Sequence, residues 1–183
     1  MTKVYTFLAN GFEEVEALCV IDLLKRASMD VVMVSVSGDL KVNGAHNIDI
    51  MADVLFEDAS FEDVDVLFLP GGMPGTKNLD NHEGLKQKLV EFNNNGKLIT
   101  AICAAPMVLG HLGILNGKDA TCYPGFEQEL IGANVLYDNV VVDGNVITSR
   151  GMGTAIDLGL KLIEVLIDKD ASFEMAEKIC YTK

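Results

Sequence analysis

Short apolar runs rich in β-branched residues alternate along this chain with segments of helical period, and this alternation constrains the fold more than any other feature. The apolar runs lie at residues 4–9, 31–36, 64–69 and 98–102, and helical segments lie at residues 13–28 and 83–95. Such βαβ units build a mainly parallel sheet with helices on both faces. Because their crossovers are right-handed, we predict a doubly wound α/β three-layer sandwich.

Turn residues interrupt the alternation twice. Residues 37–39 and 42–44 bracket short alternating pieces and indicate a β-hairpin. A second antiparallel pair is expected over residues 139–148, with its turn at Asp143-Gly144. Two further helices are predicted at residues 153–167 and 171–180.

The composition is that of a globular protein without a strong affinity for anions. Hydrophobic residues make up 49% of the chain and charged residues 22%, and no linker-like segment divides it, so we predict one domain over residues 1–183. The net charge of −13 repels phosphate groups, so neither nucleic acid nor a membrane is expected as a partner. The first apolar run is too short to span a membrane and has no cleavage site after it, so we expect a cytoplasmic protein.

The four cysteines form no recognisable framework. Cys19, Cys103, Cys122 and Cys180 include no Cys-x-x-Cys pair and have no histidine at ligand spacing. Neither a disulfide framework nor a metal site is therefore predicted. In a reducing compartment, each cysteine is by default a small apolar side chain that fills the core.

Cys103 differs from the other three because it ends an apolar strand and opens a predicted helix. Small residues follow it, and Pro106 stands where the first helical turn tolerates proline. This layout is typical of a nucleophile elbow at the carboxyl edge of a sheet. A helix N-terminus there favours the thiolate, and a neighbouring backbone N–H can stabilise an oxyanion. The strict Gly-x-nucleophile-x-Gly pattern is absent, and a buried cysteine at a crowded strand end is the alternative.

Glu16 lies inside the apolar arc of the helix predicted at residues 13–28. On a helical wheel it shares a face with Val20 and Leu23, whereas Glu14 points elsewhere. Burial raises the pKa of a carboxyl group, so we expect a protonated acid near neutral pH. The alternative is an acidic residue that complements the helix N-terminus, which explains Glu14 better than Glu16.

A glycine-rich turn follows the third apolar run, in the sequence Leu69-Pro70-Gly71-Gly72-Met73-Pro74-Gly75. It lacks the Lys-Ser/Thr pair of a phosphate loop and the spacing of a dinucleotide fingerprint, so no nucleotide site is predicted. Gly71 and Gly72 allow the backbone to approach a reacting group and to supply N–H donors. A tight turn with no further role is the alternative.

Four motifs, taken together and in order, resemble the ThiJ/PfpI (DJ-one) superfamily, in particular the subgroup of the parkinsonism-associated protein deglycase and bacterial YajL. They are Gly11-x-Glu13-Glu14-x-Glu16, Leu69-Pro70-Gly71-Gly72, Ala101-Ile102-Cys103-Ala104-Ala105-Pro106 and Thr148-Ser149-Arg150-Gly151-x-Gly153-Thr154.

The resemblance implies a flavodoxin-like sandwich with a reactive cysteine. It assigns Cys103 as that cysteine and Glu16 as the protonated acid that hydrogen-bonds its sulfur. It also implies that the backbone N–H groups of Gly72 and Ala104 form an oxyanion site and that Arg150 lies near the pocket. No organic cofactor or metal is implied.

This chain departs from the family pattern at Tyr123, which stands before Pro124 where many members have a histidine. His46 and His82 are expected in loops, and His111 is expected near the end of the helix that Cys103 opens, so none clearly replaces the missing histidine. Amide hydrolysis needs a base and an acid beside the nucleophile, which disfavours a Cys-His peptidase.

The leading functional hypothesis is a cysteine-dependent, glutathione-independent glyoxalase or deglycase. Its substrate would be a small reactive carbonyl compound such as methylglyoxal or glyoxal, converted to a 2-hydroxy acid. One alternative is an oxidative-stress sensor or chaperone that uses oxidation of Cys103. Another is a cysteine peptidase or an amidotransferase-like hydrolase.

The resemblance also implies a homodimer. Leu18 and Ile21 lie beyond the core arc of the first predicted helix, so we expect them to face a partner.

Overall fold

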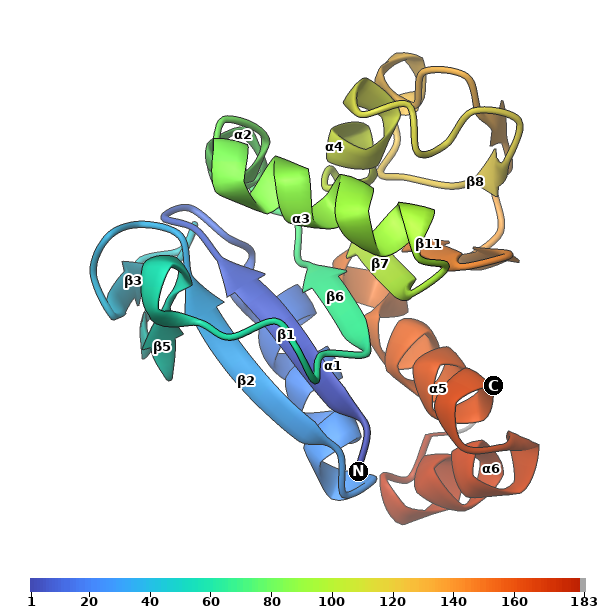
Figure 1. The fold of residues 1–183 in the computed structure, drawn as a ribbon. Helices are drawn as coiled ribbons and strands as arrows, with labels where there is room; N and C mark the ends of the chain where they lie inside the picture. The colour runs from blue at the N-terminus through green and yellow to red at the C-terminus, as the bar shows by residue number, and fades with distance from the viewer. Residues whose placement is uncertain (182–183) are drawn as a thin grey trace.

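The four apolar runs become neighbouring strands of one seven-stranded sheet (Figure 1). The computed structural model describes residues 1–181. The strand order is β10-β11-β7-β6-β1-β2-β5, and every neighbouring pair is parallel except β10 with β11. The strands of this sheet are β1 (Lys3–Leu8), β2 (Asp30–Ser35), β5 (Val54–Leu55), β6 (Val66–Leu69), β7 (Leu98–Ile102), β10 (Val140–Asp143) and β11 (Val146–Ser149).

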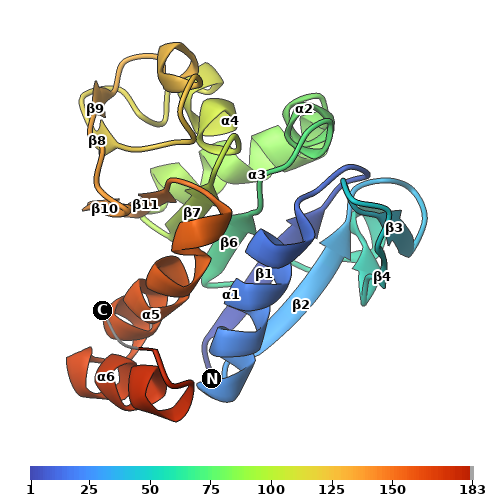
Figure 2. The ribbon, with the colours of Figure 1, turned by 180° about the vertical axis from the view of Figure 1, so that it is seen from behind.

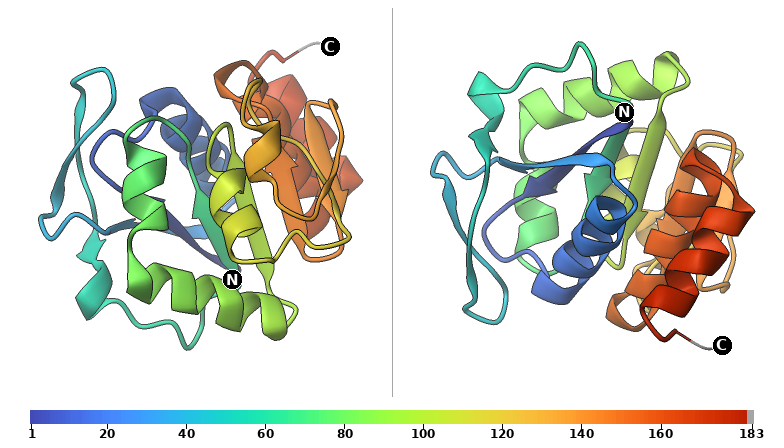
Figure 3. Two further views of the ribbon diagram at one scale, coloured as in Figure 1. Left: turned by 90° about the horizontal axis from the view of Figure 1, so that it is seen from above. Right: turned by 90° about the horizontal axis from the view of Figure 1, so that it is seen from below.

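Helices cover both faces of the sheet, so the predicted α/β three-layer architecture is confirmed (Figures 2 and 3). One face packs against α1 and α5, with α6 outside α5; the other packs against α2, α3 and α4. The helices are α1 (Glu14–Arg26), α2 (Gly75–Asp80), α3 (Glu83–Asn94), α4 (Pro106–His111), α5 (Ala155–Leu166) and α6 (Lys169–Lys178), with 3₁₀ turns η1 (Phe56–Asp58), η2 (Glu127–Glu129) and η3 (Met152–Thr154).

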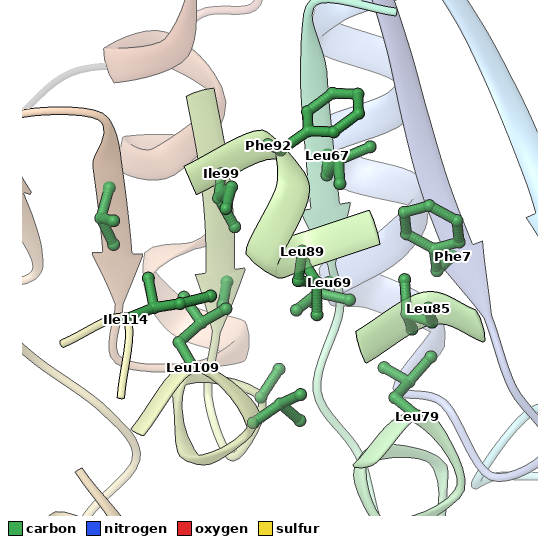
Figure 4. Packing of buried hydrophobic residues seen from close by; sticks show 14 of the residues in the cluster. Phe7, Leu67, Leu69, Leu79, Leu85, Leu89, Phe92, Ile99, Leu109 and Ile114 are labelled. Carbon is green, nitrogen blue, oxygen red and sulfur yellow. The ribbon is translucent and has the colours of Figure 1, made fainter. Parts of the chain in front are cut away.

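Side chains that alternate along the central strands divide the core into two layers. Figure 4 shows the layer beneath α2, α3 and α4, where Leu67 and Leu69 of β6 meet Leu89 and Phe92 of α3. Each of these four side chains is at most 2% exposed. Burying such a side chain contributes about 1.5–3 kcal/mol relative to leaving it in water. This packing makes the central strands a rigid support for the loops that follow them.

Both predicted hairpins form, with one difference each. The first joins β3 (Lys41–Asn43) to β4 (Asp49–Met51) as a separate two-stranded sheet, and its turn begins at Gly44. In the second, β10 and β11 turn through Gly144 in the left-handed region, and β11 also pairs with β7 in parallel. The sequence did not predict the short pair β8 (Asp119–Ala120) and β9 (Asn134–Val135), whose two-residue strands carry no periodic signal.

The carboxyl ends of β1, β6, β7 and β11 meet at one edge of the sheet, where they position the candidate site. The register pairs Leu69 with Ala101 and Ile102 with Ser149, so the loops after β6, β7 and β11 start side by side. The loop after β1 joins them, because the N–H of Glu13 donates to the carbonyl of Gly71 at 2.9 Å. No helix among residues 1–181 is long and apolar enough to cross a membrane.

Candidate active site

Cys103 sits in a strained turn directly after β7. Its φ of 64° lies in the left-handed region, which costs a residue with a side chain about 1–3 kcal/mol. Two hydrogen bonds of 2.9 Å hold it there: its N–H donates to the carbonyl of Ser149, and its carbonyl accepts from the N–H of Tyr123. This is the geometry of a nucleophile elbow. The helix that follows, α4, has only six residues, so its dipole contributes less than the sequence suggested.

Glu16 is a buried acid in the first turn of α1, as its place on the helical wheel predicted. It is 1% exposed, and its Oε2 accepts the N–H of Gly71 at 3.0 Å. Burial raises the pKa of Glu16 to about 7. The hydrogen bond with Cys103 acts in the opposite direction, the charge of Glu13 raises the pKa further, and the N–H groups of Gly71 and Met152 lower it.

Gly71 allows Glu16 and Cys103 to meet. A Cβ atom on Gly71 would lie 2.6 Å from the Cβ of Cys103 and 2.6 Å from Oε2 of Glu16. Real Cβ atoms essentially never approach this closely, so any side chain at residue 71 would push the two groups apart. Gly71 therefore has a steric role in the site, in addition to donating its N–H to Glu16.

The surroundings of Cys103 raise the pKa of its thiol to about 12. Burial is the largest cause, followed by the charge of Glu16 and the hydrogen bond with it. The N–H groups of Gly72 and Ala104 act in the opposite direction because they stabilise negative charge on the sulfur. These are the two donors that the resemblance assigned to an oxyanion site.

Glu16 and Cys103 consequently titrate as a pair. The pKa of Glu16 is raised to about 7 and that of the Cys103 thiol to about 12, so between these values the pair holds one proton, which lies on the sulfur and is hydrogen-bonded to the Glu16 carboxylate. The expectation of a thiolate favoured by its own surroundings is therefore corrected, because burial opposes it. The sulfur becomes a nucleophile when Glu16 takes the shared proton.

Tyr123 forms one wall of the site, and Gly151 adjoins it. A Cβ atom on Gly151 would lie 3.2 Å from the Tyr123 ring and 3.8 Å from Oε1 of Glu16, so the ring and the carboxyl group both lie beside Gly151. The Tyr123 side chain is 49% exposed and packs edge-on against Phe126. Tyr123 is therefore a partly exposed residue that lies next to the site.

The structure places Arg150 at the rim of this region. Arg150 directly follows Ser149, whose carbonyl accepts the N–H of Cys103. Its guanidinium group instead contacts Tyr137: it donates to the Tyr137 carbonyl at 3.1 Å and lies 5.7 Å from the centre of the Tyr137 ring. A pocket role for Arg150 stays a prediction from the resemblance.

All three histidines have partners away from Cys103. His46 Nδ1 lies 2.9 Å from Glu14, Nδ1 of His82 accepts the N–H of Leu85, and His111 lies between Asp80 and Glu129. None replaces the histidine that is missing at Tyr123. His46 lies in the loop after β3, and its backbone N–H donates to the Glu14 carboxylate. This contact explains why Glu14 is only 2% exposed, although the helical wheel placed it away from the core.

Sequence reasoning missed part of the site after β11. The N–H of Met152 acts on the Glu16 carboxylate, and Gly151 lies beside both that carboxylate and the Tyr123 ring. A backbone N–H carries no sequence signal, because every residue except proline supplies one. Gly151 belongs to the fourth motif, from which only Arg150 was predicted to lie near the pocket.

Comparisons with known proteins identify the family. The model of the DJ-1/PfpI family matches residues 2–165. The chain belongs to the DJ-1/PfpI family. It is 38% identical over 176 residues to Protein DJ-1 homolog B of Arabidopsis thaliana, covering 95% of this chain but 40% of the relative's length. The chain thus spans less than half of that plant protein.

Two other similar proteins match along all or nearly all of their length. Glutathione-independent glyoxalase DJR-1.2 of Caenorhabditis elegans is 32% identical over 173 residues, which are 93% of this chain and 91% of that protein. The structure of oxidized Toxoplasma gondii DJ-1 superposes with a TM-score of 0.96 at 35% identity and covers 100% of both chains. The predicted flavodoxin-like fold is confirmed by this likeness.

Proposed function

We propose that this DJ-1/PfpI protein is a cysteine-dependent, glutathione-independent glyoxalase that converts small α-oxoaldehydes to 2-hydroxy acids. The observation that carries the proposal is the hydrogen-bonded pair of buried Glu16 and half-buried Cys103, which lies beside two backbone N–H donors. The name of the C. elegans relative, a glutathione-independent glyoxalase, supports the same chemistry.

The first step adds the Cys103 thiol across the aldehyde carbonyl group. The sulfur forms a bond to the aldehyde carbon, and the shared proton passes to Glu16. The carbonyl oxygen becomes an oxyanion beside the N–H groups of Gly72 and Ala104, and Glu16 then returns its proton to this oxygen. The product is a hemithioacetal, with Glu16 again a carboxylate.

The second step moves hydrogen between the two carbons of the substrate. Glu16 removes the proton from the former aldehyde carbon to give an enediolate, the hydroxyl proton on that carbon passes to the neighbouring oxygen, and Glu16 delivers its proton to the neighbouring carbon. This leaves a thioester of a 2-hydroxy acid, which water hydrolyses to free Cys103. One carbon is oxidised and its neighbour is reduced, so the reaction balances without an external oxidant or reductant.

Replacing Cys103 tests the assignment directly. Cys103→Ala removes the only atom that bonds to the substrate, and we expect methylglyoxal turnover to fall at least about a thousandfold, as for loss of a covalent nucleophile. Cys122→Ala is the matched control, because Cys122 is a buried free cysteine that also follows a strand. Turnover that survives in Cys103→Ala would refute the proposal.

A second candidate function is a sensor of oxidative stress, with or without chaperone activity. A sulfinic acid on Cys103 would accept hydrogen bonds from Gly72, Ala104 and a protonated Glu16, and the related Toxoplasma gondii DJ-1 structure is of an oxidized protein. Intact-mass analysis during peroxide titration tests this candidate. We expect Cys103 to gain two oxygen atoms before Cys19, Cys122 or Cys180 reacts, and earlier oxidation of another cysteine argues against it.

A peptidase or amidotransferase-like hydrolase is less well supported. Each histidine is engaged elsewhere, and Tyr123 stands beside the site instead. An amide leaving group must receive a proton from a donor close to the nucleophile. The one proton that Glu16 and Cys103 hold is already used when the sulfur adds to the carbonyl group.

We propose further that residues 1–183 act as one domain and that the protein is a cytoplasmic homodimer. Val15 and Leu18 are 49% and 36% exposed on α1 and form an apolar strip that a second copy would cover. Ile21, which we expected in the same strip, is 5% exposed and belongs to the core of its own chain. A monomeric mass in solution at micromolar concentration contradicts the dimer.

A further inference from the structure

His111 joins three separate elements of the structure through its imidazole ring. It ends α4, and its Nδ1 lies 2.9 Å from Oδ2 of Asp80 at the end of α2. Its Nε2 lies 2.9 Å from Oε2 of Glu129 in η2. A neutral imidazole donates through one nitrogen, whereas the imidazolium ion donates through both. The geometry therefore suits the protonated ring.

The two contacts of the His111 ring form a bridge between Asp80 and Glu129. On the Glu129 side, this bridge leads to the wall formed by Tyr123. The N–H of Glu129 donates to the carbonyl of Phe126 at 3.0 Å, and the N–H of Phe126 donates to the carbonyl of Tyr123 at 3.1 Å. The N–H of Tyr123 in turn holds the carbonyl of Cys103 at 2.9 Å. Hydrogen bonds thus link the segment that holds the imidazole to the elbow.

On the other side, the bridge leads to the glycine-rich loop. Asp80 is the last residue of α2, which begins at Gly75 directly after the Gly71 to Pro74 turn. The N–H of Thr76 donates to the carbonyl of Gly72 at 2.8 Å, so the start of α2 is bonded to the residue whose N–H faces the sulfur. The bridge therefore joins the two flanks of the candidate site.

We propose that protonated His111 is a positioning residue that clamps these two flanks of the site together, and that the Tyr123 wall loosens when His111 loses its proton. The clamp follows from the distances alone. Its effect on turnover rests on the proposed glyoxalase function and regulates that same site.

The electrostatic surroundings agree with this role. Burial lowers the pKa of His111, but the hydrogen bonds to Glu129 and Asp80 and the charges of both outweigh it, so the pKa is raised from its ordinary value of 6.5. Asp80 from α2 and Glu129 from η2 face the ring, Lys86 of α3 interacts with Asp80, and the rest of α4 carries no titratable side chain. Since the folded pKa is raised, the clamp is complete below pH 6.5 and is lost as the pH rises through the folded value.

Hydrogen exchange and a histidine titration by NMR test the clamp without relying on activity. We expect His111 to titrate above 6.5 in the full chain. Protection of the Tyr123, Phe126 and Glu129 amides should fall about tenfold as the pH rises through that value, because a hydrogen bond to an ionised carboxylate is lost. In His111→Gln the protection should be low at every pH.

Two comparisons keep the test specific. His82→Asn removes a histidine but retains a side chain that can cap α3. In this variant the amides of Tyr123, Phe126 and Glu129 should be protected as in the native protein. Amides of β6 and β7 report global stability. If the β6 and β7 amides of His111→Gln lose as much protection as its loop amides do, His111 has a merely structural role. The clamp is also overturned if the protection of the loop amides in the native protein does not change with pH.

Turnover separates the clamp from the proposed function. If the clamp regulates a glyoxalase, His111→Gln raises KM for methylglyoxal about fivefold with kcat within about twofold, since the wall positions the substrate and performs no chemistry. Loop protection that responds as expected in a protein without methylglyoxal turnover leaves the clamp standing and refutes the glyoxalase. If the protein turns over methylglyoxal and His111→Gln has the KM and kcat of the native protein, the clamp has no effect on the site and this part of the proposal is refuted.

Discussion

Glu16 and Cys103, which come from opposite halves of the chain, meet above one residue that has no side chain. The carboxyl oxygen of Glu16 and the Cβ of Cys103 both crowd the position that a Cβ atom of Gly71 would occupy. Gly71 also donates its N–H to the same carboxyl oxygen at 3.0 Å. The hydrogen bond between Glu16 and Cys103 therefore depends on the absence of a side chain at residue 71.

Gly71→Ala should separate the pair. The new methyl group collides with both partners, so we expect a loss of about 1–3 kcal/mol in the free energy of unfolding, as for overpacking in a core. The rate of Cys103 alkylation at pH 7.5 should fall at least about tenfold, because the sulfur can no longer pass its proton to the Glu16 carboxylate. Urea unfolding and alkylation kinetics measure both effects.

Gly153→Ala provides the matched control for this substitution. A Cβ on Gly153 has open space around it, and its φ does not lie in the left-handed region. We expect native stability within about 0.5 kcal/mol, as for a surface substitution, and a native alkylation rate. Equal behaviour of the two alanine variants would contradict the steric role of Gly71.

The buried carboxyl group of Glu16 should make stability depend on pH. Its pKa is raised from 4.5 to about 7, so its contribution is complete below pH 4.5 and is lost as the pH rises through 7. Native protein should lose up to about 3 kcal/mol relative to Glu16→Gln between pH 4.5 and pH 8. Urea unfolding of both proteins across this range measures the difference.

Glu14→Gln should show the opposite trend. Burial raises the pKa of Glu14, but the hydrogen bonds with His46 and with the backbone outweigh burial and lower it. Its contribution is therefore present above the unfolded pKa and is lost as the pH falls. Glu14→Gln should be less stable than native protein at pH 7, with the deficit shrinking below about pH 4. The same slope for both variants would contradict these assignments.

The sheet and the helices could be predicted because periodic apolar runs report burial directly. The strands around residues 4–9, 31–36, 64–69 and 98–102 lie within two residues of their predicted bounds. Short elements such as α2, β5 and β8 escaped prediction because two to six residues are too few to show a period.

The candidate site was predictable where side chains carry the chemistry. Cys103 stood out by its place after a strand, and Glu16 by its place among apolar neighbours. The ionisation of the pair was not predictable, because it depends on how far burial outweighs two backbone donors, which only coordinates show. The burial of Glu14 was missed because its partner, the loop at His46, belongs to another element.

The central claim is that Glu16 and Cys103 share one proton above pH 7, and the pH profile of Cys103 alkylation tests it most directly. We predict a rate that rises with a midpoint near pH 7 in the native protein, since ionisation of Glu16 leaves a carboxylate that can take the thiol proton during alkylation. In Glu16→Gln, no acid can take the thiol proton, so the midpoint should move above the ordinary cysteine value of about 8.5. A native midpoint at or above about 8.5, or one that Glu16→Gln leaves unchanged, would contradict the account.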